Sequence, residues 1–131
     1  MAVILPVARG VYLCDYHVGY ANGKIDLYGV FKAIRPSYYP HEKGSFVCFA
    51  QLSGGLGNVQ IHVDIRRASD FQLVDCTDPR NVHFPDRDTL VQVAWTITGC
   101  AFDEAGLYLV ELYCDNMWVT DTALQLREAR P

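Results

Sequence analysis

Two cysteines with a histidine nearby in the sequence are the residues of this chain that could support nucleophilic chemistry. Cys14 and His17 are three residues apart in a segment of strand-like composition, and because side chains alternate along an extended chain we expect them to face opposite ways. Cys76 and His83 lie at either side of an expected flexible loop and could meet, and we expect a polar loop over 77–88. Nothing marks a third group that would orient the histidine, and buried thiols are usually inert, so we expect no enzyme.

Metal ligands are equally scattered. The 4 histidines are scattered along the chain, and neither a Cys-x-x-Cys nor a His-x-x-x-His motif occurs. We therefore expect no metal and no cofactor. His62 and Asp64 share one face of an expected strand, and we interpret this pair as a solvated cross-strand charge pattern. Asp78, Asp86 and Asp88 fall in one expected loop, as carboxylates do in calcium-binding β proteins. We interpret them as a solvated loop and leave calcium binding open.

The strand that carries His62 shows the pattern that governs the rest of the chain. Residues 59–66 alternate β-branched apolar residues with polar ones, which predicts a strand with one buried and one wet face. No helical spacing of apolar residues emerges. Further strands are expected over residues 10–20, 24–34, 45–52, 71–76, 89–98, 107–114 and 118–126. About eight strands joined by Gly, Pro, Asn and Asp turns predict an antiparallel β-sandwich of immunoglobulin-like or related topology.

Turn residues refine this expectation. Asn22-Gly23 predicts a hairpin between the first two strands, and Asp115-Asn116 predicts another near the end of the chain. Tyr108, two residues after Gly106 at the start of a strand, has the setting of a tyrosine corner, so we expect it to be structural. The final strand is expected to place on one face Trp118, Thr120, Thr122, Leu124 and Leu126.

Composition limits the class of protein. A length of 131 residues with 50% hydrophobic content predicts one domain over 1–131. The net charge of −4, with both signs interspersed, argues against nucleic acid and anionic membrane as partners. The 5 cysteines are odd in number and widely spaced, which favours a reducing cytoplasm. The apolar start, 1–6, has no basic residue and an early proline, and no segment is long enough to span a membrane.

Several short motifs, distributed over nearly the whole chain, carry a resemblance to a known family. They are Leu13-Cys14-Asp15, Gly23-Lys24, Leu27-Tyr28-Gly29-Val30-Phe31, Ile34, Tyr39-Pro40, Phe102, Gly106, Tyr108 and Leu112. On these motifs the chain resembles an uncharacterised family of small bacterial proteins, a domain of unknown function with a predicted all-β sandwich. The resemblance implies a fold and brings no catalytic residues. Where the family tends towards Asp-Gly in the final hairpin, this chain has Asp115-Asn116-Met117.

The segment 35–44 is the candidate interaction surface. It carries Tyr38, Tyr39 and His41 between prolines, and tyrosine gives a large contact area with few rotatable bonds. The alternative is that Tyr39 packs over the end of the sandwich, which leaves Tyr38 as the freer residue.

The first expected strand carries apolar bulk on both faces. Val11 and Leu13 face one way, whereas Tyr12, Cys14 and Tyr16 face the other. Either this strand is central and covered on both sides, or it forms a homodimer contact.

The sequence as a whole predicts a non-catalytic module that binds another protein. The alternatives are a small-ligand or carbohydrate binder that would use Trp95 and Trp118 and, further behind, a hydrolytic enzyme.

Overall fold

A computed structural model describes residues 3–129, and within this range the chain forms 11 strands and no helix. The outermost residues of the apolar start and of the charged tail, 1–2 and 130–131, lie outside the described range. In chain order the strands are β1 (Val7–Cys14), β2 (Tyr16–Gly19), β3 (Ile25–Tyr28), β4 (Ala33–Ile34), β5 (His41–Ser53), β6 (Gly57–Arg67), β7 (Leu73–Cys76), β8 (Arg80–Phe84), β9 (Val91–Phe102), β10 (Gly106–Cys114) and β11 (Met117–Leu126).

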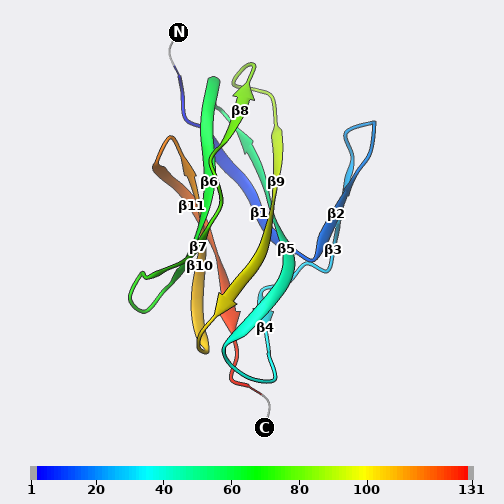
Figure 1. Cartoon of the computed structure of the whole chain (residues 1–131). Coiled ribbons are helices and arrows are strands. Elements are labelled where there is room, and N and C mark those ends of the chain that lie inside the picture. The colour runs from blue at the N-terminus through cyan, green and yellow to red at the C-terminus, as the bar shows by residue number, and fades with distance from the viewer. Residues whose placement is uncertain (1–2, 130–131) are drawn as a thin grey trace.

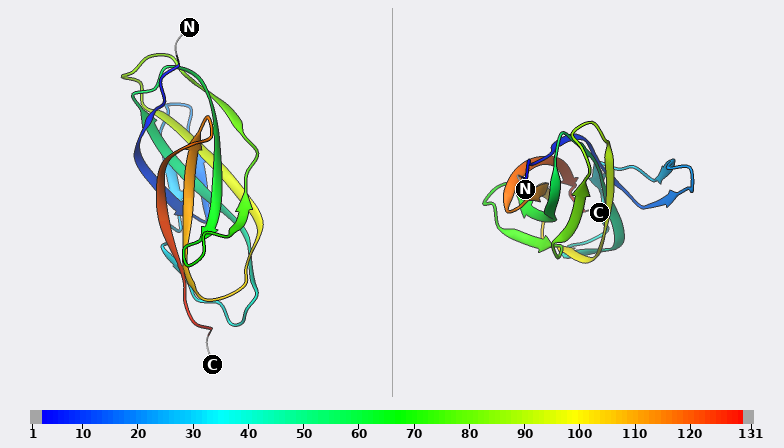
Figure 2. Two further views of the ribbon diagram at one scale, coloured as in Figure 1. Left: turned by 90° about the vertical axis from the view of Figure 1, so that its left-hand side faces the viewer. Right: turned by 90° about the horizontal axis from the view of Figure 1, so that it is seen from above.

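Two of the three sheets face one another and form the body of the molecule. One has the order β1-β5-β9, and the other has the order β4-β11-β10-β6-β7, with β8 paired to β6. Figure 2 shows the two sheets enclosing a common interior. The third sheet, β2-β3, stands away from the body (Figure 1). The all-β prediction is confirmed, whereas the prediction of about eight strands is wrong.

The larger sheet is mixed. Its strand β4 runs parallel to β11, with Ala33 opposite Gln125 and Ile34 opposite Leu126, while its other pairs are antiparallel. The prediction of a purely antiparallel sheet arrangement is therefore wrong. A strand of two residues next to Pro36 leaves no sequence pattern from which a parallel partner could be read.

The core follows from the alternation in β6. Val59, Ile61, Val63 and Ile65 are all fully buried and share one cluster with buried residues of the opposite sheet. At one end of this core the ring of Phe102 lies edge-on to the ring of Tyr108. Burial of apolar surface from both sheets holds them together.

Two turn predictions are confirmed. The hydroxyl of Tyr108 donates a hydrogen bond to the carbonyl oxygen of Glu104 at 2.7 Å, which is a tyrosine corner. The β10–β11 hairpin turns at Asp115 and Asn116, whose φ angles of 49° and 63° are those of a type I′ turn.

The prediction that Trp118 shares one face of the last strand with Leu124 and Leu126 is wrong. The register between β10 and β11 shifts at this point, since Leu112 pairs with Thr120 but Tyr113 pairs with Trp118. The extra residue, Val119, makes a β-bulge that reverses the alternation. Val119 packs against the core, and Trp118 is 55% exposed.

Three predicted segments are divided differently in the structure. The second predicted strand, 24–34, becomes β3 and β4, which belong to different sheets. The first predicted strand, 10–20, stops at Cys14, bends at Asp15 and resumes as β2 in another sheet. The predicted loop 77–88 contains β8, which pairs with β6. Across the described part of the chain there is no helix that is long and apolar enough to cross a membrane.

Candidate functional site

A projecting hairpin is the most prominent surface feature. We call β2, β3 and the turn between them the arm, residues 16–28. The two strands pair only with each other, and both Figure 1 and the view from above in Figure 2 show them extending away from the body. At the tip the amide of Gly23 donates to the carbonyl oxygen of Tyr20 at 3.0 Å, and Gly23 has a φ of 85°, as a tight turn there requires. The hairpin predicted from Asn22-Gly23 is confirmed.

The outer face of the arm is aromatic. Tyr16 and Tyr28 lie opposite each other, with ring centroids 4.6 Å apart and planes 10° from parallel. The hydroxyls of Tyr20 and Tyr28 both donate to the Asp26 carboxylate, and this interaction raises the pKa of Tyr20. All three tyrosines remain exposed, and Val18 lies on the same face. The outer face is therefore aromatic, with one carboxylate that its own tyrosines hydrogen-bond, and it is open to solvent.

The inner face of the arm packs on the body. Ile25 and Leu27 contact a small buried cluster of Cys14, Val47 and Phe49 on the outer surface of the β1-β5-β9 sheet. Burial raises the pKa of the Cys14 thiol and makes it a poor nucleophile.

This packing accounts for part of the apolar surface on the two faces of the first predicted strand. Strand β1 is an edge strand, and the arm covers its second apolar face at Cys14, while Tyr12 remains exposed. A hollow of about 540 Å³ separates the rest of the arm from the sheet, with Tyr12, Phe49 and Gln51 in its lining.

The base of the arm is held by a close backbone approach. The amide of Asp15 donates to the carbonyl oxygen of Tyr28 at 2.9 Å, and the Asp15 carboxylate lies 3.4 Å from the ammonium of Lys43 on β5. Gly29 has a φ of 67°, and a Cβ at this position would collide with the Asp15 carboxylate. Only glycine suits this junction.

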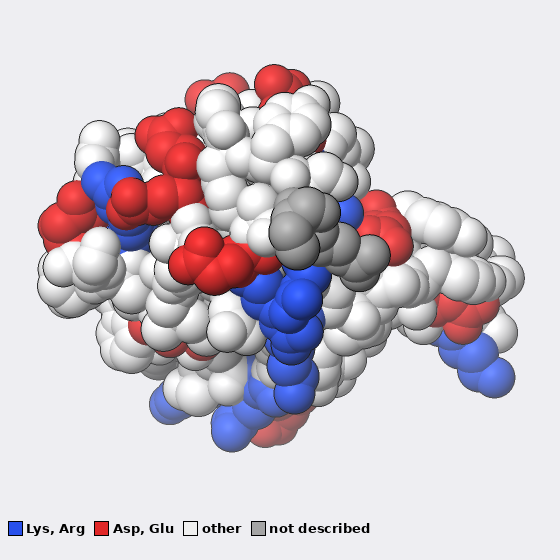
Figure 3. Space-filling model, turned by 90° about the horizontal axis from the view of Figure 1, so that it is seen from below, with Lys and Arg blue, Asp and Glu red and all other residues white. Residues whose placement is uncertain are grey.

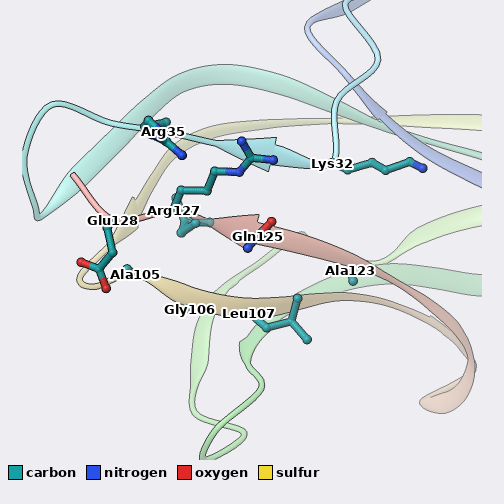
Figure 4. A pocket seen from close by; sticks show the side chains of 10 residues that line it. Lys32, Arg35, Ala105, Gly106, Leu107, Ala123, Gln125, Arg127 and Glu128 are labelled. Carbon is teal, nitrogen blue, oxygen red and sulfur yellow. The ribbon is translucent and has the colours of Figure 1, made fainter. Parts of the chain in front are cut away.

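A second surface feature is a groove on the outer side of the larger sheet (Figure 4). We call it the basic groove; it has a volume of about 800 Å³. Its floor is formed by Leu107, Ala123 and Gln125, and cationic side chains stand at its margin. The charged residues of the lining are Lys32, Arg35, Arg127 and Glu128. Seen from below, Lys and Arg side chains form a band across this end of the molecule (Figure 3).

A polar cluster lies on the outer face of β6 and β10. Asp64 and Glu111 are only 7% and 8% exposed, and Arg66 reaches both, with N–O distances of 2.9 Å to each. His62 lies 3.4 Å from the Asp64 carboxylate and stacks on the ring of Tyr113. The prediction that His62 and Asp64 form a solvated pattern is wrong, because neighbouring side chains cover the carboxylate.

Electrostatics in this cluster favour a structural role. Desolvation alone would lower the pKa of Arg66, but hydrogen bonds from its guanidinium to Asp64 and Tyr113 outweigh this effect and raise that pKa. Burial, with the nearby Glu111 carboxylate, raises the pKa of the Tyr113 hydroxyl. Every charge in the cluster is engaged within it, as expected for buried ions that would otherwise be unstable.

The residues of the predicted interaction segment are spread over different environments. Tyr38 is 73% exposed. Tyr39 packs against the core, and its hydroxyl donates to the carbonyl oxygen of Arg127. His41 lies in β5 opposite Phe102, not in a loop.

The cysteine and histidine candidates are not brought together. Cys76 lies opposite Asp64, and His83 lies opposite Asn58, six positions away along β6. At ~3.3 Å per residue this is a separation of about 20 Å.

The acidic loop candidates are separated in the same way. Asp78 precedes β8 and Asp86 follows it, so the single loop expected for them is wrong. The Asp86 carboxylate accepts hydrogen bonds from the amide and hydroxyl of Thr89 and from the amide of Asp88, and these bonds lower the pKa of Asp86. Within residues 3–129 no group of three or more potential ligands lies close enough to hold a metal ion.

Neither the aromatic face of the arm nor the basic groove is among the features predicted from the sequence. Tyr16, Tyr20 and Tyr28 flank the turn predicted at Asn22-Gly23, and their pairing across that turn is the signal that could reveal the aromatic face. The groove had no comparable signal, because its cations come from segments far apart in the chain.

These features define an all-β protein of two facing sheets with an aromatic arm and a basic groove. Residues 10–127 match the model of a family described as "Family of unknown function (DUF6941)", and the chain belongs to this family. The family resemblance found in the sequence is confirmed. No curated protein matches the chain.

Proposed function

We propose that this protein is a non-catalytic module that binds another protein through the outer face of the arm. The observation that carries the proposal is the group of three exposed tyrosines, Tyr16, Tyr20 and Tyr28, on a hairpin that projects from the body. Tyrosine is favoured at interfaces because its ring gives contact area and its hydroxyl gives a hydrogen bond at a low cost in conformational entropy.

The arm is organised before any partner arrives. The Tyr16–Tyr28 stack and the hydroxyl bonds to Asp26 restrict the rings, so less freedom is lost on binding. Both outer edges of the β2-β3 sheet lack a strand partner within the described structure. An extended segment of a partner can add to such an edge through main-chain hydrogen bonds.

Three further expectations remain part of the proposal. The facing sheets and the tyrosine corner of Tyr108 support an immunoglobulin-like or related topology. Five free cysteines, four of them buried, support a reducing cytoplasm. The segment with Tyr38 is proposed as a second contact, and a second copy of the chain is the alternative partner.

A small-ligand binder is the second candidate, favoured by a hollow of about 480 Å³ beside Trp95. The Trp95 indole nitrogen is buried and has no hydrogen-bond partner among the described residues, and the Arg80 guanidinium lies 5.5 Å from the centre of the indole ring. A ligand with an acceptor atom would satisfy such a donor. Trp118 lies on the outer face of the other sheet and is not part of this hollow.

The test is capture from native lysate followed by reconstitution with the purified partner. We expect a stoichiometric protein whose affinity falls at least about tenfold in Tyr16→Ala or Tyr28→Ala, because truncated interface tyrosines are typical hot spots. Met117→Ala alters an exposed side chain in another sheet, so it is the control and should bind normally. Tyr38→Ala tests the second contact and should weaken binding less than the arm variants do. Light scattering of the protein alone tests a second copy as the partner.

Two results would contradict the proposal. Loss of binding in Tyr38→Ala but not in the arm variants would transfer the interface to segment 35–44. Absence of any stoichiometric partner, with a monomeric mass in solution, would favour the small-ligand candidate.

A further inference from the structure

We propose that the basic groove binds a small, multiply charged organic anion, a phosphate ester or a polycarboxylate, held by Lys32, Arg35 and Arg127. This site lies outside the arm and goes beyond the protein-binding function proposed above. The two kinds of ligand share the chemistry of clustered oxyanions on a compact molecule.

The backbone brings the three cations together. Lys32 and Arg35 flank β4, and Arg127 follows the last residue of β11. The amide of Gln125 donates to the carbonyl oxygen of Lys32 at 2.9 Å, and the amide of Arg127 donates to the carbonyl oxygen of Ile34 at 2.9 Å. The parallel β4–β11 pairing therefore fixes the backbone positions from which these three cationic side chains project. In Figure 4 the Arg127 side chain extends over β4 and Arg35 lies at the end of that strand, while the Lys32 side chain extends away from the two arginines.

Their charges have no ion-pair partner among residues 3–129. The chain carries a net charge of −4, yet no carboxylate of the described residues lies within 4.0 Å of the charged atoms of Lys32, Arg35 or Arg127. A groove of about 800 Å³ has a linear dimension on the order of 10 Å, which is close to the Debye length at physiological ionic strength. Salt therefore screens much of the repulsion among the three cations, and an anion between them would relieve the part that remains.

The surroundings favour a compact anion over a long one. Asp and Glu side chains flank the basic band in Figure 3, and Glu128 lines the groove itself. A long polyanion lying across this end would meet these carboxylates, whereas a small ligand would contact the cations alone. Guanidinium groups bind phosphate and carboxylate oxygens through paired hydrogen bonds.

The floor of the groove suits the organic part of such a ligand. Leu107 and Ala123 provide apolar contact, and the amide of Gln125 provides a neutral donor and acceptor. Gly106 at the margin has a φ of 144°, which favours glycine and leaves the wall low there.

The experiment is an amide NMR titration of the isotope-labelled full chain, with pyrophosphate and citrate as separate probes. We expect saturable shifts confined to residues 32–35, 105–107 and 123–128. Arg35→Gln and Arg127→Gln should each weaken binding about tenfold, because each removes a charge-assisted hydrogen-bond donor. Raising the salt to about 0.3 M should weaken it further, since the groups are exposed.

The matched control is Lys24→Gln, which removes one exposed positive charge at the tip of the arm. It should bind both probes like the parent chain. Tighter binding of pyrophosphate would favour phosphate compounds as the ligand class, and tighter binding of citrate would favour polycarboxylates. Shifts that do not saturate, or equal weakening by Lys24→Gln and Arg35→Gln, would overturn the proposal. Arg35→Gln decides if Arg127→Gln alters the fold, because the Arg35 side chain is exposed.

Discussion

The arm and the body are both built from β-strands, but they hold their shape by different means. In the body, two sheets bury their facing sides against each other, and residues such as Ile61 and Phe102 are fully enclosed. In the arm, two four-residue strands rest on the body through Ile25 and Leu27. An isolated two-stranded hairpin is marginally stable in water, so the arm depends on this contact and on its own side-chain bonds.

The body and the arm are therefore expected to unfold differently. Loss of core contacts in the body should unfold the whole domain, whereas the arm can detach without exposing the main core. Its exposed tyrosines are tolerable on such a segment because they do not contribute to core packing. Variants that separate the two kinds of stability therefore test the description of both.

The largest effect is expected from Phe102→Ala. Phe102 is fully buried and contacts Tyr108, so its truncation leaves a cavity and should lower the free energy of unfolding by about 4 kcal/mol. Urea denaturation measures this. The control Leu90→Ala alters an exposed side chain and should change stability by less than ~0.5 kcal/mol. Similar losses in the two variants would contradict the assignment of Phe102 to the core.

Arg66→Ala should follow, with a loss of about 3 kcal/mol at neutral pH, because it leaves the buried Asp64 and Glu111 carboxylates uncompensated. The matched control is Arg67→Ala. Arg67 pairs with Asp70 and Glu104, whose carboxylates are about half exposed, so it should cost ~1 kcal/mol or less. Equal losses of stability in Arg66→Ala and Arg67→Ala would show that burial of the carboxylates does not increase the cost of removing their arginine.

Tyr108→Phe should lower the free energy of unfolding by about 1 kcal/mol, since it removes the hydroxyl bond to Glu104 and keeps the ring. Thermal denaturation measures the loss. Tyr38→Phe, in an exposed side chain, is the control and should leave the melting temperature unchanged.

Leu27→Ala should have the smallest effect on global stability, less than about 1 kcal/mol, because the loss cannot exceed the free energy with which the arm docks on the body. Hydrogen exchange should nevertheless become faster across residues 16–28. Exchange in β6 should stay as slow as in the parent chain. Faster exchange throughout the molecule would mean that arm and body unfold together.

Sequence reasoning succeeded where one local pattern decides the structure. The alternation in 59–66 and the turn residues Asp115-Asn116 depend only on neighbours in the chain. The predicted strand with its buried apolar side and the predicted hairpin turn are both confirmed. It failed where distant residues decide. The bend at Asp15 depends on a glycine fourteen positions later, Gly29, and the outward turn of Trp118 depends on a bulge defined by the register with β10.

The candidate surfaces follow the same rule. The aromatic face of the arm could have been inferred once Asn22-Gly23 was taken as a hairpin, because that pairing places Tyr16 opposite Tyr28. The basic groove required the parallel contact of β4 with β11, which no local pattern predicts. The covered carboxylates of Asp64 and Glu111 required the β6–β10 register.

The bulge at Val119 also gives the molecule two distinct optical reporters. Of the 2 tryptophans, Trp95 is enclosed in the core and Trp118 faces solvent on the outer side of the larger sheet. Trp118 emission should be red-shifted and readily quenched by iodide, while Trp95 emission should be blue-shifted and protected. A Trp118→Phe chain would then report through its fluorescence on the core alone, without any attached dye.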